Sequence, residues 1–132
     1  MNKKIGLFWL RDDFRITKNN GLIEATRNHD QVVVFYLYKK LIYKNQEAQK
    51  WWLSKSLFNF QKNLDNLNIN LEIIETDSFK NFFDKLFRKK DISIYWNKVY
   101  EPDYLKFDKY LSKNLETNNI SFADFKGNFF NF

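Results

Sequence analysis

The sequence Ile5-Gly6-Leu7-Phe8-Trp9-Leu10 is a short apolar run, and the charged residues Arg11, Asp12 and Asp13 end it abruptly. The run is too short for a core helix and shows no alternation of polar and apolar residues. Both properties are typical of a strand that is buried on its two faces, as the strands of a parallel sheet are. We therefore predict a first strand over Ile5–Leu10, with a turn directly after it.

Four more apolar runs follow and predict four more strands. They cover Gln31–Tyr38, Leu71–Ile74, Ile92–Trp96 and the shorter segment Ile120–Phe122. Between the runs, apolar side chains recur at intervals of three and four residues, which is the spacing of an amphipathic helix. These stripes predict helices over Gly21–Asn28, from Leu53 to Leu67, from Phe79 to Phe87 after an Asp77-Ser78 cap, and from Tyr104 to Leu115.

The alternation of strands and helices predicts an α/β fold. Each right-handed crossover has to lay its helix on one face of the sheet or the other. The sequence thus predicts a Rossmann-like, doubly wound, five-stranded parallel sheet flanked by helices. A chain of 132 residues can build one compact core, so residues 1–132 are expected to form a single domain.

Composition narrows the classes of protein to which the chain can belong. Hydrophobic residues make up 44% and aromatic residues 20% of the chain, as in a folded protein. There is no cysteine, which excludes a disulfide framework and a thiolate metal site. No apolar stretch approaches the length needed to cross a bilayer, so we expect a cytoplasmic protein without a membrane partner. The net charge of +6 permits attraction to phosphates, but the lysines are interleaved with acidic residues.

The residues offer little catalytic chemistry. The first strand-to-helix turn has no glycine before Gly21, whereas a phosphate-binding loop needs glycines where its amides approach phosphate. The one histidine, His29, precedes the second strand, on the side opposite the binding crevice, so we expect a helix-end residue without a catalytic role. The pair Asp12-Asp13 is expected to form ion pairs with neighbouring arginines. No catalytic residue and no metal site is predicted.

Ligands of doubly wound sheets bind beyond the carboxyl ends of the strands, which here are followed by residues 10–18, 36–51 and 96–103. Aromatic side chains are dense in and around these segments: Trp9, Tyr36, Tyr38, Tyr43, Trp51, Trp52, Tyr95, Trp96 and Tyr100. One interpretation is that the rings stack on a flat conjugated ligand. The other is that they are sheet and helix core, and spacing alone leaves both interpretations open.

Three segments carry a family resemblance. Ile5–Ile16 (IGLFWLRDDFRI) is an opening strand and turn, Ala48–Leu57 (AQKWWLSKSL) starts a long helix, and Tyr95–Pro102 (YWNKVYEP) follows as a fourth-strand signature, with an acid at Asp108. In this order and at these separations they resemble the photolyase/cryptochrome flavoproteins over essentially the whole chain. The chain is similar to the N-terminal α/β domain of a deoxyribodipyrimidine photolyase.

The resemblance implies a light-harvesting function. In the family, this domain carries an antenna chromophore, which is a folate, a deazaflavin or a flavin such as FMN, and passes the excitation to FAD in a helical C-terminal domain. Excited FAD then splits pyrimidine dimers in damaged DNA. The helical FAD-binding catalytic domain is expected to be absent from this chain. We therefore expect the chain alone to be inactive in repair and to meet damaged DNA only through that domain.

Carried over onto this sequence, the resemblance implies a chromophore site at the carboxyl ends of the strands. Its predicted residues are Leu10, Arg11, Tyr36, Leu37, Lys50, Trp51, Asn97, Val99, Glu101, Asp103 and Tyr104. Folate-binding members have an Asn-Glu pair where this chain has Asp103 and Tyr104, so the sequence departs from the folate pattern. The acidic residue of the family's first turn is replaced here by Asn19.

Three other functions stay open at this point. A cryptochrome-type photoreceptor module shares the fold but performs no repair. A nucleotide-binding module uses the same strand order, although the first loop of this chain is poor in glycine. A remnant domain without any ligand is the third.

Overall fold

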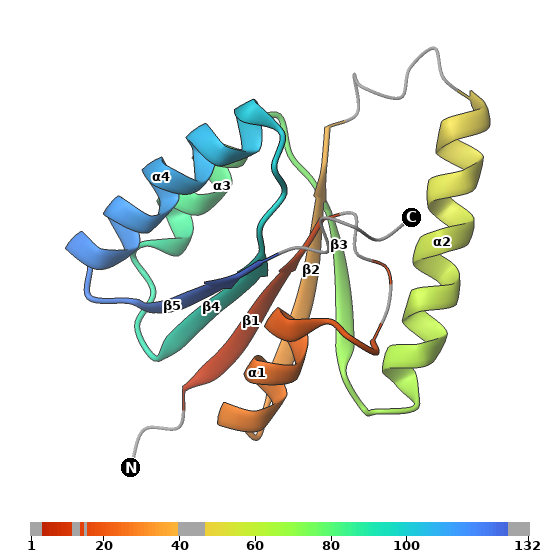
Figure 1. The fold of residues 1–132 in the computed structure, drawn as a ribbon, viewed down its shortest axis with the longest axis horizontal. Coiled ribbons are helices and arrows are strands. Elements are labelled where there is room, and N and C mark those ends of the chain that lie inside the picture. The colour runs from red at the N-terminus through yellow and green to blue at the C-terminus, as the bar shows by residue number, and fades with distance from the viewer. Residues whose placement is uncertain (1–3, 12–13, 15, 40–46, 127–132) are drawn as a thin grey trace.

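The structure is a computed structural model that describes residues 4–11, 14, 16–39 and 47–126, with side chains described from residue 53 onward in the last segment. Strands and helices alternate along the chain (Figure 1). The strands are β1 (Ile5–Leu10), β2 (Val32–Tyr38), β3 (Asn70–Glu75), β4 (Ile92–Asn97) and β5 (Ser121–Phe125). The helices are α1 (Asn20–Asn28), α2 (Glu47–Asp65), α3 (Phe79–Leu86) and α4 (Pro102–Thr117).

All strand pairs are parallel, and the strand order is β3-β2-β1-β4-β5. The chain moves outward from β1 to β3, crosses back to β4 and then moves to the other edge. The order therefore reverses between β1 and β4. Helices α1 and α2 lie on one face of the sheet and α3 and α4 on the other, as Figure 1 shows. The predicted doubly wound, five-stranded α/β fold is confirmed.

Local chemistry explains why the helices begin where they do. The side chain of Asn19 accepts a hydrogen bond from the amide of Leu22 and caps α1, and Ser78 caps α3 through the amide of Asn81. Pro102 starts α4, where its missing N–H costs no helical hydrogen bond. The cap at Ser78 confirms the cap predicted from the sequence.

Most element boundaries differ from the prediction by one to three residues, and α2 begins at Glu47 rather than at Leu53. Strand β5 runs from Ser121 to Phe125 rather than ending at Phe122, because its residues pair in continuous register with Ser93–Asn97 of β4. Helix α2 ends at Asp65, before the predicted Leu67, which is 50% exposed. Asn68 adopts a left-handed conformation with φ of 57°, and this conformation stops the helix.

The strands separate two hydrophobic cores. The α1/α2 core contains Phe8, Leu10, Val34, Tyr36, Leu57, Phe60, Leu64 and Tyr95 among its buried residues. The α3/α4 core contains Trp9, Phe35, Leu37, Phe83, Ile94, Trp96, Leu111 and Leu115. Consecutive strand residues alternate between the two cores, as the pleat of a strand requires. Trp9 and Trp96 are 2% and 0% exposed, so these two tryptophans are core residues.

Candidate functional site

A pocket of about 380 Å³ lies between α2 and the carboxyl-terminal halves of β2 and β3. It is lined by Tyr36, Tyr38, Leu53, Ser54, Leu57, Phe58, Gln61 and Ile73. The strands supply Tyr36, Tyr38 and Ile73, and α2 supplies the other residues. The volume falls at the lower end of the range for small-molecule sites, and the lining is mainly apolar and aromatic, as such sites usually are.

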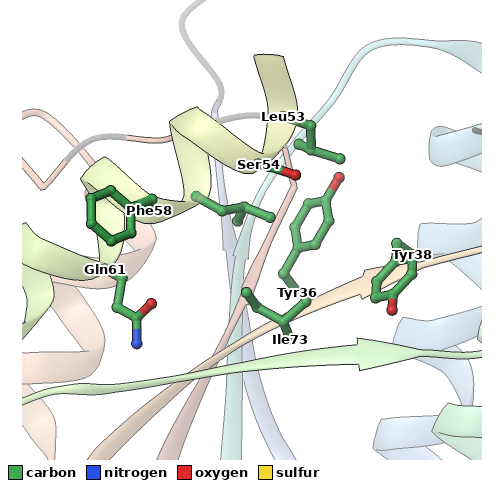
Figure 2. A pocket seen from close by; sticks show the side chains of 8 residues that line it. Tyr36, Tyr38, Leu53, Ser54, Phe58, Gln61 and Ile73 are labelled. Atoms are coloured by element: carbon green, nitrogen blue, oxygen red, sulfur yellow. The ribbon is translucent and has the colours of Figure 1, made fainter. Parts of the chain in front are cut away.

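The pocket has a buried floor and an exposed mouth. Tyr36 and Leu57 form the floor and are 6% and 7% exposed. Phe58 and Ile73 are 57% and 47% exposed and mark the mouth. Figure 2 shows the ring of Tyr36 standing between the sheet and α2, with its hydroxyl directed toward the turn that carries Leu53 and Ser54.

Aromatic contacts hold Tyr36 in place. The ring of Phe14, from the segment after β1, lies 6.0 Å from the Tyr36 ring and 6.4 Å from the Phe60 ring, measured between centroids. Leu10, which is 0% exposed, belongs to the same core. Tilted and edge-on ring pairs at these distances are favourable and restrict rotation of the rings. The floor of the pocket is therefore preformed by residues that follow β1 and by the body of α2.

Arg11, the first residue after β1, is buried on the opposite face of the sheet. Its Nη1 donates to Oδ2 of Asp108 in α4 at 3.1 Å, and its Nη2 donates to Oδ1 of the same carboxylate. The guanidinium carbon lies 4.1 Å from the ring centroid of Trp9 and 5.0 Å from that of Tyr104. The side chains of Arg11 and Asp108 are only 2% and 9% exposed. This forked ion pair therefore ties the carboxyl end of β1 to α4.

Asn97, the last residue of β4, supports the start of α1. Its Oδ1 accepts a hydrogen bond from the amide of Gly21 at 2.9 Å, and its Nδ2 donates to Oδ1 of Asn19 at 2.7 Å. Asn19 Oδ1 also accepts from the amide of Leu22 at 3.1 Å. A Cβ atom on Gly21 would lie 2.7 Å from Phe8 Cε1, so the close approach of α1 to the sheet requires glycine there. The amides of Gly21 and Leu22, in the first turn of α1, thus donate to side chains of the protein itself.

Protein side chains therefore occupy the point where strand order reverses. Asn19, Asn97 and Arg11 are each no more than 6% exposed. In doubly wound nucleotide-binding proteins, the amides at this helix N-terminus hold a phosphate. Here those of Gly21 and Leu22 already donate to asparagine oxygens. The arrangement disfavours a phosphate at the start of α1, whereas the pocket beside α2 is an open concave site among the described residues.

Comparison with known proteins identifies the family. A model of the DNA photolyase family matches residues 6–131. The chain belongs to the DNA photolyase family. A deoxyribodipyrimidine photo-lyase of Agrobacterium fabrum is 26% identical over 121 residues, which cover 92% of this chain and 25% of that protein.

Solved structures share the fold of this photolyase-family chain. The class III photolyase of Agrobacterium tumefaciens superposes with a TM-score of 0.81 at 24% identity and covers 96% of this chain. An archaeal photolyase from Sulfolobus tokodaii, which contains two FAD molecules, gives 0.77 at 22% identity over 92% of the chain. The Synechocystis cryptochrome gives 0.78 at 17% identity over 93%. The chain spans 26%, 29% and 27% of these proteins, respectively, or about a quarter.

The structure divides the predicted chromophore residues of this photolyase-family chain among separate places. Tyr36 lines the pocket, and Leu10 lies in the same core. Leu37 points to the α3/α4 core instead, because it directly follows Tyr36 in a strand. Lys50 and Trp51 lie in α2, but their side chains fall outside the described part of the chain.

The remaining predicted residues lie around the β4–α4 connection. Asn97 is buried under α1, and Arg11 and Tyr104 lie together beside Trp9 on the α4 side. Val99 is half-buried in the connection. Glu101 occupies the N-cap position of α4 without a capping hydrogen bond from its side chain, and Asp103 is an exposed acid in the first turn. None of these residues is among the described residues that line the pocket beside α2.

Sequence reasoning missed part of the pocket and the partner of Arg11. Leu53 and Leu57 belong to the apolar stripe that predicts the long helix, and Gln61 lies four residues further on the same helix face, but this spacing does not by itself indicate a pocket. Ile73 lies in the predicted strand Leu71–Ile74, which was not connected with a pocket. Asp108 was named only as an acid that follows the fourth-strand motif, whereas it forms the buried ion pair with Arg11. The predicted ion-pair partners Asp12 and Asp13 lie outside the described residues.

His29 is a helix-end residue, as predicted. It forms the C-cap of α1, its Nδ1 lies 2.9 Å from the carbonyl oxygen of Lys4, and its Nε2 lies 2.9 Å from the hydroxyl of Tyr95. In residues 4–11, 14, 16–39 and 47–126, no group of three or more His, Cys, Asp or Glu side chains is arranged to hold a metal ion. Across the same described ranges, no helix combines the length and the apolar character needed to span a membrane.

Proposed function

We propose that this chain is a light-harvesting domain that holds an antenna chromophore in the pocket beside α2. The observation that carries the proposal is an open aromatic pocket whose floor is Tyr36, a residue that the family resemblance assigned to the chromophore site. Leu10 belongs to the core behind it, and Lys50 and Trp51 are proposed to contribute from the first turns of α2. Flat conjugated rings bind favourably in such surroundings through stacking and apolar burial.

The partner of this domain is proposed to be a helical FAD-binding domain of a longer chain. The photolyase-family relatives are about four times as long as this chain, which supports the proposal. The antenna would absorb light and pass its excitation to FAD, and the FAD domain would bind damaged DNA and split pyrimidine dimers. One solved relative, the Sulfolobus tokodaii photolyase, contains two FAD molecules and is associated with a novel light-harvesting cofactor. A flavin is therefore a reasonable candidate ligand beside deazaflavin and folate.

A cryptochrome-type photoreceptor is the second candidate. The Synechocystis cryptochrome shares the fold over 93% of the chain, which supports this alternative. Both functions use the antenna pocket in the same way and differ in the chemistry of the FAD domain. Measuring dimer repair under blue light with the longer protein that carries this chain's own FAD domain separates the two functions, because only a photolyase is expected to repair dimers.

The pocket is tested by absorption spectroscopy on the purified chain with added folate, deazaflavin and FMN. We expect one of them to bind and to retain an absorption band at longer wavelength than the aromatic side chains. Ser54→Trp should fill the exposed pocket and weaken binding by at least about tenfold, because a rigid ring then occupies the ligand volume. Asn59→Trp is the matched control, since Asn59 is exposed on α2 and does not line the pocket. Equal losses in both variants, or no binding at all, would refute the proposal.

A further inference from the structure

The described lining of the pocket is uncharged. Its polar groups are the hydroxyls of Tyr36, Tyr38 and Ser54 and the amide of Gln61, and the other lining residues are apolar. Hydroxyl and amide groups can hydrogen-bond the edge of a ring but do not offset the cost of removing an anion from water. An anionic group of a ligand is therefore disfavoured against this described part of the lining.

The open mouth of the pocket allows a charged group of a bound ligand to remain in solvent. Tyr36 and Leu57 close the floor, whereas Phe58 and Ile73 at the mouth are about half exposed. A ring that stacks on the floor leaves any substituent pointing between α2 and β3 toward solvent. Among the described residues β3 pairs only with β2, so no further strand covers this side of the pocket mouth.

A cation close to the mouth faces solvent rather than the pocket interior. The Nζ of Lys62 lies 4.7 Å from the ring centroid of Phe58, which is itself 57% exposed. Ion pairs in such exposed positions contribute little, because water screens both charges and two flexible groups must be ordered. Lys62 therefore adds little affinity for an anionic tail.

We propose that the pocket selects its ligand by an uncharged aromatic ring and leaves the anionic tail in solvent, so that the tail contributes little to affinity. The inference rests on the proposed function, because it requires that the pocket binds an antenna chromophore. It adds that the pocket recognises the ring of the chromophore and not its tail. A ring and the same ring with a phosphate or glutamate tail should bind almost equally well.

The test compares matched ligand pairs on the 132-residue chain. The pairs are riboflavin and FMN, a deazaflavin with and without its phosphate-bearing tail, and a neutral pterin and folate, which carries the glutamate tail. Dissociation constants are measured by fluorescence titration at low and at physiological salt. For the pair that binds, we expect the two constants to differ by less than about fivefold and to change little with salt.

A gain-of-charge variant checks the direction of the tail. Gln61 is exposed on α2 and lines the pocket, so Gln61→Lys places a cation at the mouth without disturbing the core. It should strengthen binding of the anionic member relative to the neutral member by roughly two- to fivefold, a ratio that Gln61→Met should leave as it is in the natural sequence. Gln61→Met is the matched control, because it keeps the length of the side chain and adds no charge.

Three results contradict the inference, and they are distinguishable. If the anionic member binds about tenfold more tightly than the neutral one at low salt and loses this advantage at physiological salt, the protein binds the charged tail directly. In that case the antenna function stands, and Lys50→Gln and Lys62→Gln show which cation is responsible. If Gln61→Lys leaves the anionic member unchanged, the tail does not leave by this mouth. If no member of any pair binds, the proposed function fails and the inference fails with it.

Discussion

Replacement of Arg11 by methionine tests how the buried ion pair supports the fold. Arg11→Met keeps much of the side-chain volume but leaves the carboxylate of Asp108, a residue only 6% exposed, without its cation. Breaking a buried pair from one side typically costs about 3–5 kcal/mol, because the remaining charge stays desolvated. Contact of the guanidinium with the rings of Trp9 and Tyr104 is also lost. A loss of this size is a large share of the roughly 5–15 kcal/mol that stabilises a typical domain.

The free energy of unfolding is measured by urea denaturation followed by far-ultraviolet circular dichroism. With a denaturant slope of about 2 kcal/mol/M, the expected loss lowers the urea midpoint by roughly 1.5–2.5 M. Arg27→Met is the matched control, because Arg27 forms an exposed ion pair with Glu24 at 3.2 Å. That variant should lose only about 0–1 kcal/mol.

The double variant Arg11→Met/Asp108→Leu separates a charge effect from a packing effect. Removing both charges avoids the stranded carboxylate, so stability should return to within about 1 kcal/mol of the natural sequence or exceed it. The reasoning is refuted if Arg11→Met costs no more than Arg27→Met. It is refuted as well if the double variant is as unstable as Arg11→Met alone. Asp108→Asn, which retains one hydrogen-bond acceptor, serves as a milder probe if Arg11→Met does not fold.

Two further predictions concern other contacts of the fold. Asn97→Ala leaves the amide of Gly21 without its side-chain acceptor and should cost about 2–3 kcal/mol by the same urea assay, whereas the exposed Asn118→Ala should cost less than about 1 kcal/mol. Partial burial, followed by the hydrogen bond to Asp84 at 2.5 Å and the charge of that carboxylate, raises the pKa of Tyr110 to about 12. Because this pKa lies above the unfolded value of 10.0, the stabilising contribution is complete below pH 10.0 and is lost as the pH rises through about 12. Absorbance titration of tyrosinate should show one late-titrating tyrosine that moves toward its ordinary pKa in Asp84→Asn; an unchanged titration would contradict the assignment.

The fold was largely predictable because its signals are local. The run from Ile5 to Leu10 is apolar throughout, and a strand with a core on each side requires that pattern. The helices were predictable because residues three and four apart lie on the same helix face, so apolar residues at these intervals can be recognised in the sequence itself. The ends were less predictable. The extension of β5 to Phe125 depends on its pairing with β4, and the end of α2 depends on the left-handed conformation of Asn68.

The candidate site was predictable only in part, because its residues depend on which face each side chain occupies. Tyr36 was correctly placed near the carboxyl end of a strand, and it lines the pocket. Family resemblance grouped it with Leu37, Arg11 and Asn97, but Leu37 and Arg11 lie on the α3/α4 face of the sheet, and Asn97 is buried under α1. The pairing of Arg11 with Asp108 joins positions 97 residues apart, and a local sequence pattern cannot predict such a contact.

The sequence by itself determined the alternation of strands and helices, the family, and the absence of a glycine-rich phosphate loop, because each of these is written in short motifs and local periodicity. Only the tertiary structure decided that Asn19 and Asn97 occupy the start of α1 and that the open pocket lies beside α2. The physical reason is that hydrogen bonding and burial are properties of neighbours in space. Those neighbours are brought together by strand order and helix packing rather than by distance along the chain.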